Sequence, residues 1–141
     1  MVRYDEDSRL EPKHGRVEFI TTMRYIKKYL HPGMRVLEIG AGTGRYSHAL
    51  AQDGYEVDAV ELVESNIEVF KNNTQPGELV KITQGDAREL INYTDSTYDV
   101  TLLLGPMYHL FTREDQEEAL AEAVRVTKPG GVIFTAYCMG D

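Results

Sequence analysis

The sequence contains a single cysteine, Cys138, which excludes an internal disulfide framework. It also lacks an apolar run long enough to cross a membrane, and its polar, acidic start does not resemble a signal peptide. We find no internal repeat and no low-complexity tract. These absences favour a soluble, cytoplasmic protein with no membrane partner.

Positive charge is scarce, with 15 Lys and Arg against 23 Asp and Glu and a net charge of −8. Broad attraction to nucleic-acid phosphates is therefore disfavoured, and we do not expect nucleic acid as a partner. A local basic pocket stays open; the densest positive cluster is "RYIKKYL", residues 24–30. We assign no set of metal ligands. The 141 residues suffice for one domain with a sizeable core.

Short apolar runs alternate with amphipathic segments along most of the chain. We expect helices over 45–53, 64–74 and 113–127, and strands over 34–39, 55–62, 78–84, 98–104 and 132–138. The strands are almost continuously apolar, which suits a parallel sheet covered by helices on both faces. The sequence therefore predicts a doubly wound, mostly parallel, Rossmann-like α/β fold. In the helix over 113–127, we expect Leu120, Ala123 and Val124 to face inward.

The first 33 residues lie outside this alternating unit. Residues 14–30 predict a helix with Val17, Ile20, Met23, Tyr25 and Ile26 available to pack. We expect residues 1–33 to form a cap or brace beside the sheet, and residues 34–141 to form the core.

A glycine-rich turn, "GAGTG" at residues 40–44, follows the first expected strand. Glycines there permit positive φ and close approach of a ligand, in the region where doubly wound sheets bind ligands. The spacing is G-x-G-x-G rather than the dinucleotide G-x-G-x-x-G, and Arg45 follows Gly44. A pyrophosphate is therefore disfavoured. No P-loop is present, since no Gly-Lys-Ser/Thr follows. The alternative is that the glycines only shape the turn.

Acidic residues near the turn indicate the kind of ligand. Glu61 lies at the end of the second strand, about 20 residues after the first glycine, where an acid accepts hydrogen bonds from ribose hydroxyls. Glu38 adds a second negative charge, which favours a ligand with an ammonium and a sulfonium over a pyrophosphate. In the alternative interpretation, Glu61 is a solvated strand-end residue and Asp86 is the N-cap of a short helix at 87–90.

Five segments together resemble the class I S-adenosylmethionine-dependent methyltransferases. "VLEIGAGTGRYS" resembles that family's first motif, and the resemblance covers roughly residues 34–137. The further segments, in order, are "VELVESNIE", "QGDAREL", "YDVTLLLGPMYHL" and "RVTKPGGVIFTAY".

The resemblance implies S-adenosylmethionine as the cofactor. It implies Glu61 as the ribose-binding acid, with Leu62 beside the adenine. Asp86 would lie near the adenine amino group, where Ala87 offers its backbone N–H. The complete set of implied cofactor-binding residues is Glu38, Gly40, Ala41, Gly42, Gly44, Glu61, Leu62, Asp86, Ala87 and Leu104.

Methyl transfer from a sulfonium needs alignment of the acceptor above all, since the leaving group departs neutral. Tyr108 and His109 follow the fourth strand; His109 can remove a proton from the acceptor and Tyr108 can position it. The alternative is that both pack the next helix. The segment lacks the Asn/Asp-Pro-Pro-Tyr tetrapeptide, which with the acidic charge favours a small-molecule acceptor. An RNA or protein methyltransferase, or a non-catalytic S-adenosylmethionine-binding module, stays open.

The family fold usually carries two further strands beside the fifth, whereas this sequence stops at Asp141. We therefore expect a sheet that lacks those two strands. The chain would then be either a fragment of a longer protein or a minimal form of the family fold. Residues 132–138 would then be an exposed apolar edge strand, which invites pairing. We expect a homo-oligomer through this edge.

Overall fold

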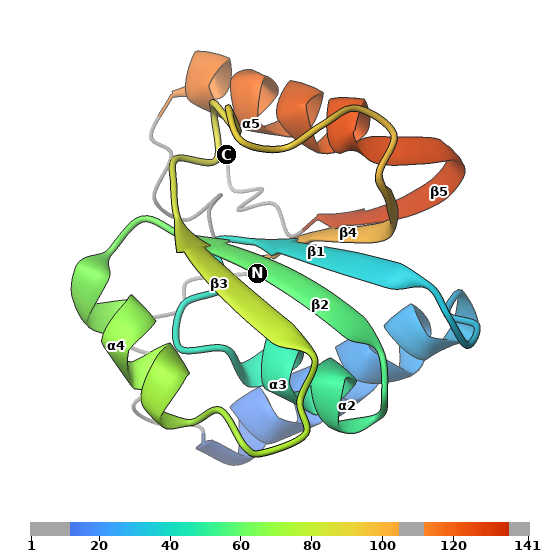
Figure 1. Ribbon diagram of the computed structural model, residues 1–141, viewed down its shortest axis with the longest axis vertical. Coiled ribbons are helices and arrows are strands. Elements are labelled where there is room, and N and C mark those ends of the chain that lie inside the picture. Colours follow the sequence, from blue (N-terminus) through green and yellow to red (C-terminus); the bar gives the residue numbers. More distant parts are fainter. Residues whose placement is uncertain (1–11, 105–111, 136–141) are drawn as a thin grey trace.

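The computed structural model describes residues 12–104 and 112–135. Its centre is a five-stranded sheet in the order β3-β2-β1-β4-β5, with every neighbouring pair parallel (Figure 1). The strands are β1 (Arg35–Ile39), β2 (Glu56–Glu61), β3 (Val80–Gln84), β4 (Tyr98–Leu103) and β5 (Thr127–Thr135). The helices are α2 (Pro12–Lys28), α3 (Arg45–Gln52), α4 (Glu64–Asn72) and α5 (Arg113–Val126).

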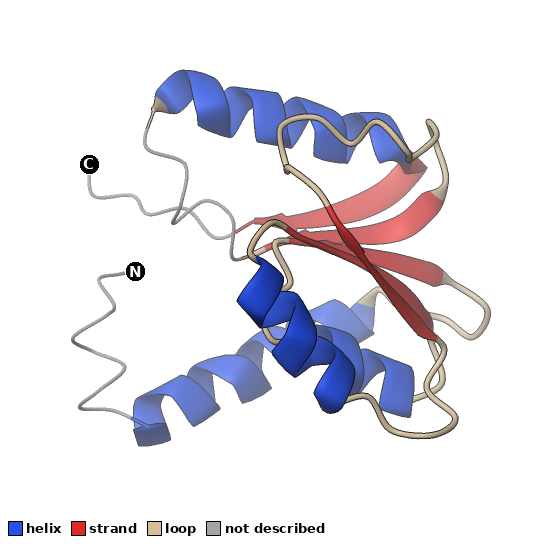
Figure 2. Ribbon diagram, turned by 60° about the vertical axis from the view of Figure 1, so that its left-hand side comes forward, coloured by secondary structure: helices blue, strands red, loops and turns tan. Residues whose placement is uncertain are grey.

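Helices cover both faces of the sheet. Helices α2, α3 and α4 lie on one face and α5 lies on the other (Figures 1 and 2). Strand β1 alternates between the two layers: Val36 packs with Met23 and Ile26 of α2, and Leu37 packs with Ala123 of α5. The predicted doubly wound, parallel fold is confirmed.

The buried faces of two helices differ in detail from the prediction. In α5 the buried positions are Ala119, Ala123 and Val126, a spacing of four and three residues that lines one helical face. Val124 was predicted to face inward, but it is 58% exposed because it lies off that face. Leu120, at the rim of the face, is half-buried.

Helix α2 is confirmed, and it packs into the main core rather than standing apart from it. Met23, Ile26 and Leu30 are buried together with residues of β1, β2 and α3. Val17, Ile20 and Tyr25, which were also predicted to pack, are exposed instead. Whether residues 1–33 cap a functional site stays a prediction.

The expected short helix at 87–90 is wrong. Residues 86–89 form a turn closed by an isolated bridge between Asp86 and Glu89. The Arg88 backbone N–H donates to Asp86 Oδ1 at 2.9 Å, so the Asp86 side chain closes a turn on its own backbone rather than capping a helix. The fifth strand, expected from residue 132, begins at Thr127, and residues 136–138 of that expectation lie outside the described residues.

Candidate functional site

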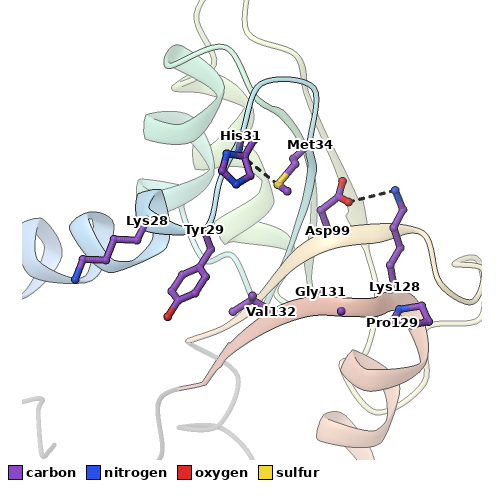
Figure 3. Close-up of a pocket in the computed structure, with 10 residues that line it drawn as sticks. Lys28, Tyr29, His31, Met34, Asp99, Lys128, Pro129, Gly131 and Val132 are labelled. Carbon is purple, nitrogen blue, oxygen red and sulfur yellow. Dashed lines mark hydrogen bonds and ion pairs between the residues drawn. The ribbon is translucent and has the colours of Figure 1, made fainter.

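The two edges of the sheet differ in character. At the amino edge, a cavity of about 300 Å³ lies between the end of α2 and the start of β5 (Figure 3). Tyr29, His31 and Met34 line one side of it, and Asp99 pairs with Lys128 across the other at 3.2 Å. The sequence places the candidate residues at the opposite, carboxyl edge.

The glycine turn lies at that carboxyl edge, between β1 and α3. Gly40, Gly42 and Gly44 have φ values of 74°, 62° and 97°, which confirms the positive φ that the turn predicts. The backbone N–H groups of Gly40 and Ala41 both donate to the Val60 carbonyl, at 2.7 and 3.0 Å, and so hold the turn against β2.

Two glycines of the turn have different surroundings. A Cβ on Gly42 would meet nothing within 4 Å, so the space over this residue is open. A Cβ on Gly44 would lie 2.5 Å from Phe70 Cδ2 and 2.7 Å from His48 Cδ2, so its backbone packs directly on two rings. Gly42 therefore faces the space that a ligand can enter, whereas Gly44 fixes the turn to the protein.

Glu61 ends β2 beside this turn and is only 6% exposed. Its Oε1 accepts from the Gly42 N–H at 2.7 Å, and its Oε2 accepts from the Val63 N–H and the Asn66 side-chain amide, both at 3.1 Å. The alternative of a solvated strand-end residue is therefore wrong. The carboxylate joins the glycine turn to the start of α4.

Glu38 is buried beneath the same turn, with 2% exposure. It accepts a hydrogen bond from Ser47 Oγ at 2.6 Å, in the first turn of α3. Burial above all, and to a smaller extent the nearby charge of Glu61, raise its pKa to about 8, although hydrogen bonds from Ser47 oppose the shift. A cation bound near these two carboxyl groups would favour the ionised form of Glu38, so the pair suits a positively charged ligand.

Asp86 lies next to Glu61, since the Gly85 N–H donates to the Glu61 carbonyl at 3.1 Å. The Arg88 guanidinium donates to the Asp86 carboxylate from Nε to Oδ1 at 3.1 Å and from Nη2 to Oδ2 at 2.8 Å. These hydrogen bonds lower the pKa of Asp86. Arg88 also donates to Asp115 of α5 at 3.1 Å. The sequence prediction missed Arg88, although its position two residues after Asp86 was a signal for such a pair.

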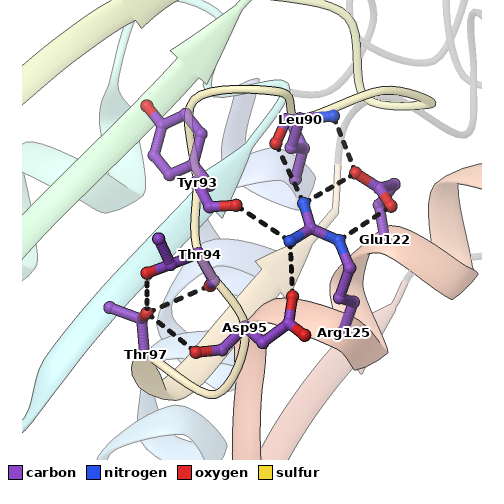
Figure 4. Close-up of polar contacts among 7 residues, drawn as sticks. All are labelled: Leu90, Tyr93, Thr94, Asp95, Thr97, Glu122 and Arg125. Carbon is purple, nitrogen blue, oxygen red and sulfur yellow. Dashed lines mark hydrogen bonds and ion pairs between the residues drawn. The ribbon is translucent and has the colours of Figure 1, made fainter.

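The segment that carries Asp86 is held to α5 by Arg125 (Figure 4). The Arg125 guanidinium donates to the backbone carbonyls of Leu90 and Tyr93 at 2.9 and 2.8 Å, and it forms an ion pair with Asp95 at 2.8 Å. Glu122 accepts from the Leu90 N–H at 2.7 Å. An irregular segment thus has a defined shape without a helix of its own.

The other predicted site residues are placed as follows. Leu62 is 58% exposed at the end of β2, which leaves an apolar side chain at the edge of the site. Ala87 is half-buried against the core on the α5 face, and Leu104 is half-buried against the core on the other face. Tyr108 and His109, the predicted catalytic pair, lie outside the described residues.

Two classes of site are not seen in the described part of the chain. None of its helices is long and apolar enough to span a membrane. Among residues 12–104 and 112–135, no group of three or more His, Cys, Asp or Glu side chains is arranged to hold a metal ion.

Comparison with known proteins bears on the same region. A family model described as a methyltransferase domain matches residues 37–135. A glycine/sarcosine N-methyltransferase from Aphanothece halophytica is 31% identical over 106 residues, which cover 74% of this chain and 40% of the relative. A cypemycin N-terminal methyltransferase from Streptomyces sp is 31% identical over 128 residues, covering 90% of this chain and 49% of the relative. The crystal structure of the PH0226 protein from Pyrococcus horikoshii OT3 matches with a TM-score of 0.77 at 25% identity, covering 94% of this chain and 66% of that one.

The parallel sheet, the glycine turn and the acid that ends β2 define a Rossmann-like domain built to bind a nucleoside. With the family match over residues 37–135, the chain belongs to the class I S-adenosylmethionine-dependent methyltransferases. It spans 49% or less of the length of the two curated relatives.

Proposed function

We propose that the protein binds S-adenosylmethionine at the carboxyl edge of its sheet and transfers the methyl group to a small-molecule acceptor. The observation that carries this proposal is the environment of the Glu61 carboxylate. Its carboxylate is buried, fixed by three donors and bound to the backbone of Gly42 in the glycine turn. A fixed acid at the end of the second strand is the group that selects ribose hydroxyls.

The described residues fit this cofactor. Among the described residues, no atom lies within 4 Å of a Cβ placed on Gly42, so a ligand can approach the backbone there. Glu61 gives that space a negative potential, and a bound cation would favour the ionised form of Glu38, so the pair suits an ammonium and a sulfonium. In this proposal the exposed Leu62 covers one face of the adenine, and Asp86, fixed by Arg88, accepts from its amino group.

S-Adenosylmethionine supplies a methyl carbon that an acceptor lone pair attacks in line, while the electron pair of the breaking bond returns to sulfur. The protein has to align the acceptor and exclude water, and positioning of this kind contributes roughly 7–11 kcal/mol in favourable cases. A proton leaves the acceptor in the same reaction. We propose that His109 takes that proton and that Tyr108 positions the acceptor.

The acceptor class rests on the charge of the chain and on its relatives. A net charge of −8 disfavours a polyanionic acceptor such as RNA. The name of one relative specifies glycine and sarcosine, and the name of another specifies the amino terminus of cypemycin. A small amine is therefore our first candidate. The amino terminus of a peptide is the second, because that relative is matched over 90% of this chain.

A methyl-transfer screen tests the proposal. The protein is incubated with S-adenosylmethionine carrying a labelled methyl group and with amino acids, other small metabolites, a short peptide or RNA. Transfer to a small molecule supports the proposal, and transfer to the peptide alone supports the second candidate. Transfer to RNA alone, or cofactor binding without any transfer, contradicts the proposed acceptor or the proposed catalysis. Turnover that survives His109→Ala removes His109 as the proton acceptor.

A further inference from the structure

A buried histidine, His48, lies directly behind the glycine turn. The ring is on α3 and the residue is 7% exposed. Its Nδ1 lies 2.8 Å from Glu78 Oε1, and its Nε2 lies 3.0 Å from the backbone carbonyl oxygen of Phe70. The ring therefore links α3 to α4 and to the turn that precedes β3.

Both partners of the ring are hydrogen-bond acceptors. A backbone carbonyl has no proton to donate. The Glu78 side chain is 2% exposed; although burial opposes it, hydrogen bonds from Gln52 and His48 lower the pKa of Glu78 and keep it a carboxylate. Each ring nitrogen must then carry a hydrogen to make its bond. With Glu78 as a carboxylate, both ring nitrogens face acceptors, so the geometry points to an imidazolium; a neutral ring would turn one lone pair toward an acceptor.

The surroundings of the ring contain few other charges. Gln52 of α3 donates to Glu78 Oε2 at 2.8 Å, and Thr74, after α4, donates to the Phe70 carbonyl at 3.1 Å. Lys71, next to Phe70, is exposed. Glu78 is thus the charged group in hydrogen-bond contact with the ring among the described residues.

The same ring forms part of the surface that shapes the glycine turn. The His48 and Phe70 rings lie 4.4 Å apart, and the backbone of Gly44 packs on both. The His48 N–H donates to the Gly44 carbonyl at 2.8 Å, and the preceding residue, Ser47, donates to Glu38. A shift of the ring would therefore move the turn and the first turn of α3 together.

We propose that His48 is a positioning residue for cofactor binding. Its doubly protonated ring, bridging Glu78 and the Phe70 carbonyl, holds the surface on which Gly44 packs, so that cofactor affinity depends on this protonation. The inference rests on the proposed cofactor site. It adds a group that contacts the turn from behind and never touches the ligand.

The first test is spectroscopic and needs no variant. In a long-range ¹H–¹⁵N spectrum at pH 7.5, both ring nitrogens of His48 are expected at the shifts of protonated nitrogens. A free imidazole, with a reference pKa of about 6.5, is mostly neutral there. Ring nitrogens that show the neutral pattern at pH 7.5 would overturn the inference.

The second test uses Glu78→Gln. A glutamine amide keeps the packing and can donate to Nδ1, so a neutral ring retains both of its hydrogen bonds. Binding of S-adenosylhomocysteine is measured by calorimetry between pH 6.5 and 9. For the wild type, we expect the affinity to fall about threefold to tenfold more than for Glu78→Gln, the size expected for the loss of one ordinary hydrogen bond. Other titrating groups, Glu38 among them, are the same in both proteins, so the difference between the two pH profiles reports on the Glu78–His48 pair.

His31→Gln is the matched control, because His31 is exposed and lies at the amino edge of the sheet. Its pH profile is expected to equal that of the wild type. Equal pH profiles for the wild type and Glu78→Gln would overturn the role of His48 alone. Absence of binding by the wild type at every pH would contradict the proposed function itself, and with it this role.

Discussion

At the scale of single residues, the two glycines that look alike in the turn are expected to respond differently to a methyl group. Gly42 faces open space, so Gly42→Ala carries only the backbone cost of positive φ, about 1 kcal/mol of unfolding free energy. Gly44→Ala forces a methyl onto the rings of Phe70 and His48 and is expected to cost about 2–4 kcal/mol.

Urea unfolding together with calorimetry checks this contrast. Gly42→Ala is expected to remain folded and to lose cofactor affinity, because its methyl fills the space that the ligand enters. Gly44→Ala is expected to lose stability first. Two variants with equal stability and equal affinity would show that the turn is not divided in this way.

Glu38 predicts a pH dependence of folding. Its pKa of about 8 in the folded protein lies above the ordinary value of 4.5, so the folded state binds more protons between these values. This contribution to stability is present below about pH 4.5 and is lost as the pH rises toward 8. Glu38→Gln removes it, so the unfolding free energies of variant and wild type are expected to diverge by roughly 1 kcal/mol per pH unit in that window.

Urea titrations at pH 5, 6.5 and 8 measure this divergence, and the wild type is expected to be the one that loses stability as the pH rises. Ser47→Ala serves as a second variant, because it removes the hydrogen bond to Glu38 and leaves the carboxyl group in place. A constant difference between Glu38→Gln and the wild type at all three values would contradict the raised pKa.

Residue types with local roles could be predicted from the sequence. The glycine-rich turn predicted positive φ values, and the position of Glu61 predicted an acid at the end of a strand. The Arg88 partner of Asp86 was missed although it lies two positions away, whereas the partner of His48 could not be predicted. Glu78 lies 30 positions from His48, so only the folded arrangement of α3, α4 and β3 brings these two side chains together.

At the scale of elements, β1, β2 and β4 were predicted to within one residue at each end, because a buried parallel strand is a short apolar run bounded by turns. The segment after β3 was predicted worst. Asp86 followed by "AREL" satisfies a local helix-start pattern, but Arg88 pairs with Asp86 and Asp115, and Arg125 binds the carbonyls further along. The contacts with Asp115 and Arg125 come from α5, about 30 residues away, and no local pattern contains them.

The contacts of Arg125 predict that α5 controls the order of this segment. Arg125→Met removes the donors to the Leu90 and Tyr93 carbonyls and the partner of Glu122, and is expected to cost about 1–3 kcal/mol. Amide exchange in residues 86–97 is expected to accelerate while that of β1 and β2 stays slow. Arg113→Met, at the exposed start of α5, is the control. Equal exchange in the two variants would rule out this anchoring role.

At the scale of the whole molecule, β5 is the edge strand beside β4 in the sheet that the described residues form, and its residues Val132, Ile133 and Phe134 are half-buried. An apolar edge strand offers unpaired backbone groups to another copy. We therefore expect a homo-oligomer. Light scattering coupled to size-exclusion chromatography measures the mass, and a monodisperse monomer at micromolar concentration would contradict this expectation.

The central claim is that the glycine turn and Glu61 form a site for S-adenosylmethionine. Isothermal titration calorimetry of the protein with this cofactor tests it most directly. We expect one site per chain, and an affinity about tenfold or more weaker in Glu61→Gln, because both oxygens of Glu61 accept hydrogen bonds and glutamine replaces one of them with an NH₂ group that can only donate. Glu64→Gln, at the exposed start of α4, is expected to bind like the wild type. No heat of binding with the wild type, or equal affinities for the wild type and Glu61→Gln, would contradict the account.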